Sequence, residues 1–503
     1  MNLLEIGADG LDTGKPAFFR FRPLGDRVLL TNLEGRFVVL DDADFGRFAR
    51  GEVEAGTPLF EQLSRENFLR ESFDEAKAAA MIRARRRFLD AGPNLHVLVV
   101  TLRCNTTCVY CHASRANMDE VETDMTPEIA ERAIDLILQT TSDYVTIEFQ
   151  GGEPLVNFEV VKHAIEYALS KNASAGKQLE FTMVSNFALL DEEKLDYLLE
   201  HRVQLCTSID GPADLHDSVR KLPRADGSAH GHAVRWTRRI NERYRELGLE
   251  ETLYHVEALV TVTRELLHRE RELVDTYTEL GCRALFLRPL DPFGFADKTQ
   301  HLIEYPREDY LAFYRRTVDY IIERNKQGVE ILERYAAIFL TKILNGEDPN
   351  FLDVRQPAGA GIGQLAYSYD GQIFTCDEGR MLDAMGDSSF RLGDVHMSSY
   401  RDLVGHETVR AVVLAGQLDG HPDCVHCAYN PYCGIPPVHS HKSQGSIWGR
   451  KRESSLCHVH KGILDYLFEK LATADQETLE VLQRWTTSRS RDHFLHRVTV
   501  GAV

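Results

Sequence analysis

The sequence LHVLVVTLRCNTTCVYC, residues 95–111, places three cysteines directly after an apolar run. The run at 95–103 is rich in valine and leucine, which predicts a buried strand. Cys104, Cys108 and Cys111 follow within eight residues, whereas the whole chain of 503 residues has only ten cysteines. So few cysteines do not make a disulfide scaffold, and a group of this kind in a reducing compartment is typical of metal ligands.

Outward from this stretch, strand patterns alternate with amphipathic helical patterns to about residue 325. The alternation predicts parallel strands joined by crossover helices, and therefore an α/β fold. It leaves open whether six such units form an open doubly wound sheet or a partial barrel. Either arrangement gathers functional residues at the carboxyl ends of the strands. The predicted strands are residues 95–103, 144–150, 179–185, 203–210, 254–262 and 284–290, and the predicted helices are residues 126–141, 157–172, 191–201, 230–247, 264–280 and 307–325.

The sequence on either side of this core has a different character. Residues 18–40 contain short strand-like runs with a tight turn at Glu34–Gly35, and after about residue 350 loops rich in glycine and proline carry the remaining cysteine group. We expect the last stretch, from Thr486 on, to be a loosely held tail. Further helices are expected near 41–50, 58–70, 73–91, 458–471 and 475–487, and the expected domains are residues 1–92, 93–325, 326–475 and a C-terminal helix and tail at 476–503.

The charge and hydropathy of the chain argue against two classes of partner. Lys and Arg total 58 against 77 Asp and Glu, which gives a formal net charge of −19. An acidic balance disfavours nucleic acid as the main partner. The first residues do not resemble a secretory signal, and no segment reaches about 18 uninterrupted apolar residues. We therefore expect a cytoplasmic protein that binds neither membrane nor nucleic acid.

Three cysteines on one loop supply fewer thiolates than a closed iron–sulfur cluster uses. A [4Fe–4S] cluster normally has four cysteine ligands, so Cys104, Cys108 and Cys111 would leave one iron open to another ligand. The alternative is a structural zinc site, which requires four closed ligands. His112 could serve as the fourth ligand of such a zinc site.

The C-x3-C-x2-C spacing, with Tyr110 just before the last cysteine, resembles the radical S-adenosylmethionine (SAM) superfamily. Gly-Gly-Glu-Pro at 151–154 and Ser-Asn at 185–186 end the second and third predicted strands, where members of this superfamily have similar motifs. The segment SIDGPADLHDSVR, residues 208–220, is similar to one in its peptide-modifying branch. The resemblance implies a partial (β/α)6 TIM-type barrel, a [4Fe–4S] cluster on the three cysteines and SAM bound at the open iron.

The same resemblance implies roles for single residues. The Gly-Gly-Glu-Pro segment would bind the methionine amino group of SAM, Ser208 would touch its ribose and Arg220 would meet its carboxylate. Asp210 is the catalytic candidate, because it could take the proton lost as a substrate radical is oxidised. It could instead simply fix the Asp-Gly-Pro turn, and Asp377 and Glu378 are further acid–base candidates. The implied cofactor-binding residues are Tyr110, Gly151, Gly152, Glu153, Pro154, Ser185, Asn186, Ser208 and Arg220.

A second cysteine group lies near the C-terminus. Cys424-x2-Cys427-x5-Cys433, followed by Cys457, could form a zinc ribbon on spacing alone. Together with the Gly-x4-Cys segment at 371–376, the group resembles the SPASM extension of radical SAM peptide maturases, which binds auxiliary [4Fe–4S] clusters.

Two cysteines of the full SPASM pattern are replaced here by Ala358 and Pro437. The resemblance therefore implies one auxiliary cluster, held by the four cysteines of the second group. Cys376 is then either a free thiol near the active site or a participant specific to this protein. Cys206 and Cys282 lie in apolar patterns and are expected to be buried structural thiols.

The N-terminal 92 residues resemble the small PqqD-like domain of ribosomal-peptide maturases, which captures a leader peptide as an added strand. Several longer stretches, such as LRPLDPFGFA at 287–296, resemble radical SAM maturases of the His-Xaa-Ser system. These resemblances imply a precursor peptide with a leader as substrate, a carbon–carbon or thioether crosslink as product, and flavodoxin or ferredoxin as electron donor. The alternatives are a sulfatase-maturase-like enzyme that makes formylglycine, a zinc-stabilised scaffold without turnover, and a radical SAM enzyme that modifies nucleic acid.

Overall fold

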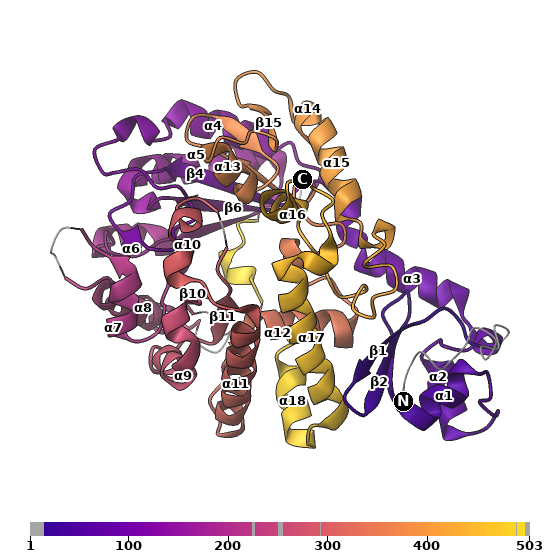
Figure 1. Ribbon diagram of the computed structural model, residues 1–503. Coiled ribbons are helices and arrows are strands. Elements are labelled where there is room, and N and C mark those ends of the chain that lie inside the picture. The colour runs from indigo at the N-terminus through magenta and orange to yellow at the C-terminus, as the bar shows by residue number, and fades with distance from the viewer. Residues whose placement is uncertain (1–14, 224–226, 250–254, 292, 489, 498–503) are drawn as a thin grey trace.

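The computed structural model describes residues 15–223, 227–249, 255–291, 293–488 and 490–497 (Figure 1). Its centre is a ten-stranded sheet in the order β12-β11-β10-β8-β7-β6-β4-β13-β14-β15. The strands are β1 (Arg20–Leu24), β2 (Arg27–Thr31), β3 (Phe37–Asp41), β4 (Leu95–Thr101), β5 (Thr107–Cys108), β6 (Tyr144–Gly151), β7 (Gln178–Val184), β8 (Gln204–Ser208), β9 (Arg220–Lys221), β10 (Glu257–Thr261), β11 (Ala284–Arg288), β12 (Leu332–Glu333), β13 (Gln364–Tyr367), β14 (Gln372–Phe374) and β15 (Arg391–Asp394).

The six predicted core strands are confirmed as β4, β6, β7, β8, β10 and β11. They lie side by side in chain order, and each pairs in parallel with its neighbours. This order identifies a singly wound sheet, because a doubly wound sheet reverses its strand order at a switch point. The sheet continues beyond the predicted units, since β13 pairs in parallel with β4 and then β14 and β15 add antiparallel strands.

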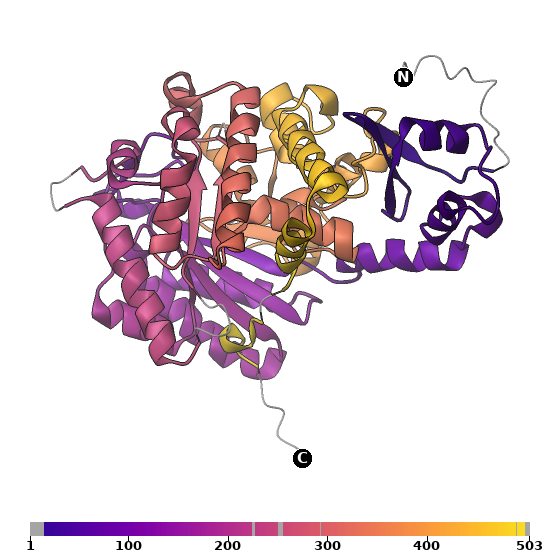
Figure 2. The same ribbon diagram turned by 90° about the horizontal axis from the view of Figure 1, so that it is seen from below.

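The helices that connect these strands lie on the outer side of the curved sheet (Figures 1 and 2). The predicted helices of this region are confirmed, although the one expected at 264–280 is divided into a 3-10 turn and α9. The helices of the chain are α1 (Asp42–Ala49), α2 (Pro58–Arg65), α3 (Glu75–Arg85), α4 (Pro127–Ile137), α5 (Phe158–Ala175), α6 (Glu192–Glu200), α7 (Ala213–Val219), α8 (Ala229–Glu246), α9 (Glu270–Glu279), α10 (Ala296–Ile303), α11 (Arg307–Lys326), α12 (Arg334–Leu340), α13 (Asp377–Ala384), α14 (Tyr400–Val404), α15 (Glu407–Gly416), α16 (Pro437–Gln444), α17 (Ser455–Thr473) and α18 (Gln476–Arg484).

The two faces of the sheet have opposite polarity. On β6, Val145, Ile147 and Phe149 belong to the hydrophobic core that the outer helices cover. The alternate residues Thr146, Glu148 and Gln150 face a cavity on the inner side. Side chains alternate across a strand, so the same alternation on β7 and β8 gives the sheet one dry face and one polar face.

The N-terminal unit is an antiparallel sheet in the order β1-β2-β3, covered on one face by α1 and α2. The predicted turn between β2 and β3 is confirmed, and Gly35 adopts a φ of +76° there. The other face of this sheet packs on α17, where the Phe37 and Phe468 rings lie 5.2 Å apart. In Figure 2 the unit projects from the side of the molecule and is joined to the core through α3.

The end of the chain corrects one prediction. The segment from Thr486 on was expected to be a loose tail, but residues 490–497 dock on the sheet, while 489 and 498–503 lie outside the described residues. Arg491 donates from Nε to Glu180 at 2.8 Å, and His496 forms a β-bridge with Leu179. Phe494 is buried in the core. Tertiary contacts of single residues hold this segment in place, and its sequence has no periodic pattern from which the docking could be predicted. In the described residues, no helix is long and apolar enough to cross a membrane.

Candidate active site and cysteine clusters

The first cysteine loop leaves the carboxyl end of β4 and is fixed by a short strand pair. Thr107 and Cys108 pair in β5 with Lys221 and Arg220 in β9. Cys104 Sγ lies 3.3 Å from the Thr106 hydroxyl, and the same hydroxyl lies 3.8 Å from Cys108 Sγ. Burial raises the pKa of Cys104 to about 12 and also raises that of Cys108. These thiols are therefore neutral unless a metal displaces their protons.

The Gly-Gly-Glu-Pro segment packs directly on the backbone that precedes Cys104. Gly151 has a φ of +154°, and a Cβ there would lie 2.1 Å from the carbonyl oxygen of Thr101. A Cβ on Gly152 would lie 2.3 Å from the carbonyl oxygen of Leu102. Only glycine permits this approach. In the structure, the glycines bring the ends of β4 and β6 together, and Gly152 donates its amide to Thr101 at 2.8 Å.

Glu153 connects the ends of β6 and β7. Its carboxylate accepts from Ser185 Oγ and from the Asn186 amide, both at 2.8 Å, and from the Leu155 amide at 3.1 Å. Burial raises its pKa to about 7, although these donors oppose the shift. Asn186 in turn donates from Nδ2 to Asn105 of the cysteine loop at 2.8 Å. The predicted residues at the ends of β6 and β7 are thus joined in one network with the cysteine loop that follows β4.

Asp210 is held from several sides. Its Oδ2 accepts from Arg220 Nε at 2.7 Å and from the Tyr110 hydroxyl, and its Oδ1 accepts from the Thr261 amide at 3.1 Å. Burial alone raises the pKa of Asp210, but the Arg220 guanidinium and nearby His216 outweigh it and hold the pKa below its ordinary value. These contacts favour the structural alternative for Asp210, because a carboxylate with a low pKa and filled acceptor positions is a poor base.

The inner face of the sheet encloses a cavity of about 440 Å³. Tyr110, Ser208 and Arg220 line it, so three of the predicted cofactor-binding residues face the same space. Cys206 lines it too, although its apolar sequence pattern predicted a buried structural thiol. The correction follows from strand geometry, because Cys206 is two residues before Ser208 on β8 and must share its face. Cys282 is buried as expected, with 2% of its surface exposed.

Several carboxyl groups line one side of the same cavity around Arg288. They belong to Asp291, Asp353, Asp377 and Glu378. Burial raises the pKa of Asp291 to about 7. Burial, and to a smaller extent the neighbouring carboxylates of Asp353 and Asp377, raises the pKa of Glu378 to about 8. Asp377 is instead paired with Arg380, whose Nε lies 2.7 Å from its Oδ1.

Arg288 and Asp353 are functional candidates that sequence reasoning missed. Arg288 is the last residue of β11, so its position at a strand end was an available signal. Asp353 lies in a short 3-10 turn, Leu352–Val354, and has no such signal.

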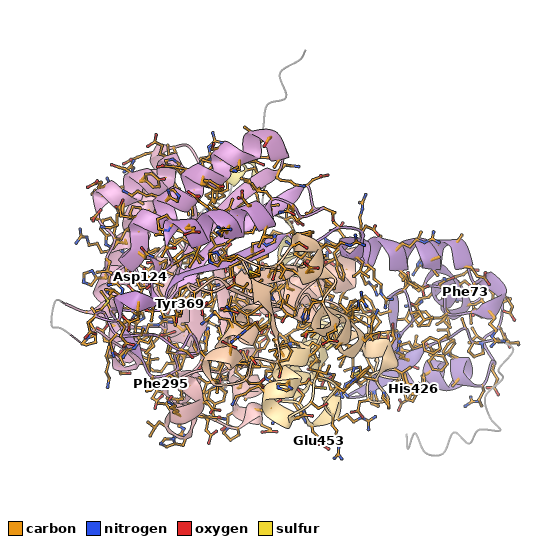
Figure 3. The ribbon with its side chains drawn as sticks, turned by 90° about the horizontal axis from the view of Figure 1, so that it is seen from above. Phe73, Asp124, Phe295, Tyr369, His426 and Glu453 are labelled. Atoms are coloured by element: carbon orange, nitrogen blue, oxygen red, sulfur yellow. The ribbon has the colours of Figure 1, made fainter. Side chains whose placement is uncertain are left out.

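A second cavity, of about 560 Å³, lies on the other side of the cysteine loop. Cys108 and Cys111 line it together with Phe295 and Met385. The segment before α10 closes on this loop, because the Ala296 amide donates to the Cys111 carbonyl at 3.0 Å. Phe295 is labelled at the edge of the molecule in Figure 3, and it is 42% exposed. Cys111 and the adjacent His112, which lines the first cavity, thus face different spaces.

The second cysteine group gathers four thiols from two segments. Cys424 and Cys457 are buried with Ile435 and Leu418, and Cys433 packs against them. Burial raises the pKa of Cys433, and the proximity of the thiols of Cys424, Cys427 and Cys457 raises it further.

The donor set and its surroundings suit a metal cluster. Cys457 is the third residue of the long helix α17, whose N-terminus favours a thiolate. The buried Ser454 hydroxyl beside that helix start has no hydrogen-bond partner among the described residues. Among all the described residues, no three His, Cys, Asp or Glu side chains are already arranged around a single ion position. What favours a cluster at both groups is the donor chemistry: three thiols in one loop and four in the other.

Cys376 is 2% exposed and lies in a small apolar cluster. Its neighbours there include Ala360, Met381 and Val438. Ala358 and Pro437, the two positions that depart from the SPASM pattern, are also buried, and their near neighbours Ala360 and Val438 belong to the cluster of Cys376. Cys376 Sγ also accepts from Thr375 Oγ1 at 3.6 Å. The apolar cluster of Cys376 is distinct from the cluster that holds Cys424, Cys433 and Cys457.

Comparison with known proteins agrees with this geometry. Residues 98–276 match the model of the Radical SAM superfamily, so the chain carries a radical SAM domain. The cysteine-type anaerobic sulfatase-maturating enzyme of Clostridium perfringens is 22% identical over 379 residues, which cover 73% of this chain and 94% of that protein. An uncharacterised protein of Methanocaldococcus jannaschii is 31% identical, but the match spans only 41% of its length.

Two solved structures share the fold. The anSMEcpe structure with bound AdoMet and the Cp18Cys peptide has a TM-score of 0.61 at 19% identity, and the alignment covers 78% of this chain and 99% of that one. Streptococcus suis SuiB bound to the precursor peptide SuiA has a TM-score of 0.51 at 14% identity, with 87% and 98% covered. At these identities the likeness establishes the fold alone.

Proposed function

We propose that this protein is a radical SAM enzyme that modifies a ribosomally made precursor peptide by forming a crosslink within it. The observation that carries the proposal is the loop of Cys104, Cys108 and Cys111, which follows β4 inside the matched radical SAM domain. In this proposal the three thiolates hold a [4Fe–4S] cluster at which SAM binds. One-electron cleavage of SAM to a 5′-deoxyadenosyl radical, which takes a hydrogen atom from a substrate, is the chemistry that these groups supply when bound.

The residues of the chain orient the cofactor and exclude water. Thr106 bridges two of the thiols, and Arg220 places Nη1 3.8 Å from Cys108 Sγ, so a cation stands beside the thiolate that forms there. Ser208 and Tyr110 face the central cavity, where we place SAM and the reacting part of the peptide. The glycines at 151 and 152 keep the loop tight against β6.

Among the carboxyl groups of the cavity, Glu378 suits the role of proton acceptor better than Asp210. Its raised pKa makes it a stronger base, whereas Asp210 is committed to Arg220 and Tyr110. A base with a pKa near the working pH is the efficient one. We therefore assign to Glu378 the proton released when the substrate radical is oxidised, and the auxiliary cluster, when bound at the second cysteine group, would accept the electron. Asp210 is then a positioning residue.

A peptide substrate is supported by the shared fold, since solved structures with the same fold hold peptides. The N-terminal sheet is suited to capturing a leader segment as an added strand, as its likeness to PqqD-like domains implies. In this proposal the second cysteine group holds one auxiliary [4Fe–4S] cluster, and a flavodoxin or ferredoxin supplies electrons. The resemblance to maturases of the His-Xaa-Ser system remains a prediction.

The decisive experiment is anaerobic incubation of the purified protein with SAM, a reductant and each short peptide encoded beside its gene. Mass spectrometry should detect 5′-deoxyadenosine together with a peptide that has lost two hydrogen atoms. The variant with Cys104, Cys108 and Cys111 all replaced by Ala should produce neither. Cleavage of SAM without a mass change in any neighbouring peptide would contradict the maturase proposal.

A second candidate, formation of formylglycine in a sulfatase, is favoured by the match to 94% of the clostridial sulfatase-maturating enzyme. Ala358 and Pro437 count against it, because the sulfatase maturases are expected to use the full set of auxiliary cysteines. Incubation with a peptide from a sulfatase active site separates the two candidates. An aldehyde that reacts with a hydrazine probe would identify the second activity.

A further inference from the structure

A buried arginine of the N-terminal sheet reaches the second cysteine group. Arg20 begins β1 and is only 3% exposed. Its Nε donates to the carbonyl of Val425 at 2.7 Å, and its Nη2 lies 3.4 Å from Asp419. Val425 stands between Cys424 and Cys427, so the guanidinium is seated on the cysteine loop itself.

One donor of this guanidinium has no partner. Arg20 Nη1 is buried and makes no hydrogen bond in the part of the chain that the structure describes. A buried charged donor left unsatisfied is costly, so a negative group is expected beside it. Burial lowers the pKa of Arg20, and the carboxylate of Asp419 and the thiol of Cys427 oppose that shift, which places Cys427 among its neighbours.

Two buried lysines from other parts of the chain lie near enough to the same thiols to interact with them electrostatically. Lys451 is 1% exposed, and its Nζ donates to Ser440 Oγ at 3.0 Å. Lys342 is 5% exposed and donates to the carbonyl of Val354. Burial lowers the pKa of each to about 8; Asp348 and then Cys433 oppose the shift at Lys342, and Cys424, Cys433 and Cys457 oppose it at Lys451. Arg20 and Lys342 each have one carboxylate nearby, Asp419 and Asp348, whereas Lys451 has thiols alone. Further negative charge at the thiols would therefore stabilise these buried cations.

The N-terminal sheet also holds the backbone of this loop. Thr31 donates from Oγ1 to the carbonyl of Ala428 at 2.7 Å, and the Tyr432 hydroxyl donates to the carbonyl of Gly35 at 3.0 Å. Figure 3 labels His426, between the first two cysteines of the loop, at the boundary with the N-terminal unit that carries Phe73. Residues of a sheet about 400 positions earlier in the chain therefore hold the loop in place by hydrogen bonds.

We propose that Arg20, Lys342 and Lys451 form a buried cationic shell that stabilises the cluster on the second cysteine group and raises its reduction potential. The inference rests on the proposed function, because it takes the four cysteines to hold an auxiliary [4Fe–4S] cluster. Reduction adds a negative charge, and nearby positive charge and N–H groups directed at sulfur favour the reduced form. In this proposal the N-terminal unit contributes residues that surround the auxiliary cluster, in addition to binding peptide.

The test measures the auxiliary cluster without turnover. Cys104, Cys108 and Cys111 are replaced by Ala, so that the auxiliary cluster is the one observed, and the protein is reconstituted with iron and sulfide. Redox titration followed by electron paramagnetic resonance then compares the parent with R20Q, R20K and K451Q. Arg27→Gln is the matched control, because Arg27 belongs to the same sheet but is exposed.

We expect R20Q and K451Q each to lower the ratio of reduced to oxidised cluster about tenfold at a fixed potential, which is a shift of about 59 mV for one electron. R20K should stay near the parent, and R27Q should match it. Loss of the cluster in R20Q with retention in R20K supports the same role for the charge. Equal potentials in the parent, R20Q and K451Q would overturn the shell, as would R20K behaving like R20Q. If the parent protein binds no iron at the four cysteines, the proposed auxiliary cluster itself is wrong.

Discussion

Arg220 donates from Nε to Oδ2 of Asp210 at 2.7 Å, and this ion pair joins the first cysteine loop to the fourth core strand. Asp210 follows β8, whereas Arg220 begins β9, the partner of the loop strand β5. Both side chains are largely buried, with 2% of the aspartate and 14% of the arginine side chain exposed. The pair therefore connects the cysteine loop to the wall of the central cavity.

Replacing Asp210 with Ala should destabilise the fold strongly, because it leaves the Arg220 charge buried and unpaired. We expect the free energy of unfolding to fall by about 3–5 kcal/mol, measured by denaturant titration. D214A removes a carboxylate from an exposed pair with Arg269 and should have little effect. Near-normal stability of D210A, with loss of product alone, would restore Asp210 as a catalytic base.

The raised pKa of Glu153 makes the stability of the protein depend on pH. The native pKa is about 7, against an ordinary value of 4.5, so the folded state holds a proton that the unfolded state releases. The contribution of this group is complete below pH 4.5 and is lost as the pH rises through about 7. A shift of this size corresponds to about 3 kcal/mol. In thermal unfolding, the stability of wild type relative to E153Q should therefore decrease from pH 5 to pH 8. A constant relative stability would show that Glu153 does not titrate there.

Glu378→Gln should separate SAM cleavage from product formation. The proposed base is lost while the cysteine loop is untouched, so 5′-deoxyadenosine should still form, and crosslinked peptide should fall by about 10²-fold or more. Because burial raises the pKa of Glu378, wild-type product formation should increase with pH across the neutral range as the carboxyl ionises. Quantitative mass spectrometry of both products checks this, and equal losses of both would assign Glu378 a structural role.

Iron analysis distinguishes Cys376 from the four cysteines of the second group. Wild-type protein should bind about eight irons, and Cys457→Ala about four, since a cluster that loses one thiolate of four is expected to be lost. Cys376→Ser should keep the full iron content, because Cys376 lies in apolar packing away from that group. C457A should retain some SAM cleavage without crosslinked product. A loss of iron in C376S would instead indicate a third cluster.

The sequence predicted the core because local pattern determines it. The apolar run of β6 and the glycines that end it are visible in a single stretch, and so is the C-x3-C-x2-C loop after β4. What could not be predicted depends on contacts between distant residues. No local signal places Arg20 on the loop of Cys424, or Asp353 beside Arg288. Cys206 is different, because its inward direction follows from Ser208 two residues later, so strand parity would have corrected the expectation.

The docked C-terminal segment gives the last prediction. Arg491 donates to Glu180, whose side chain has no exposed surface, and to Gln204 at 3.0 Å. Arg491 also lines the central cavity, so the segment closes the cavity at the end opposite the cysteine loop.

Arg491→Ala should lower the free energy of unfolding by about 1–3 kcal/mol, less than loss of a fully buried pair, because 42% of the arginine side chain is exposed. It should also speed hydrogen exchange at the amides of Leu179 and His496, which bond to each other's carbonyls. Arg497→Ala breaks only a local pair with Asp492 and should leave exchange unchanged. Equal exchange in both variants would mean that the β-bridge alone holds the segment in place.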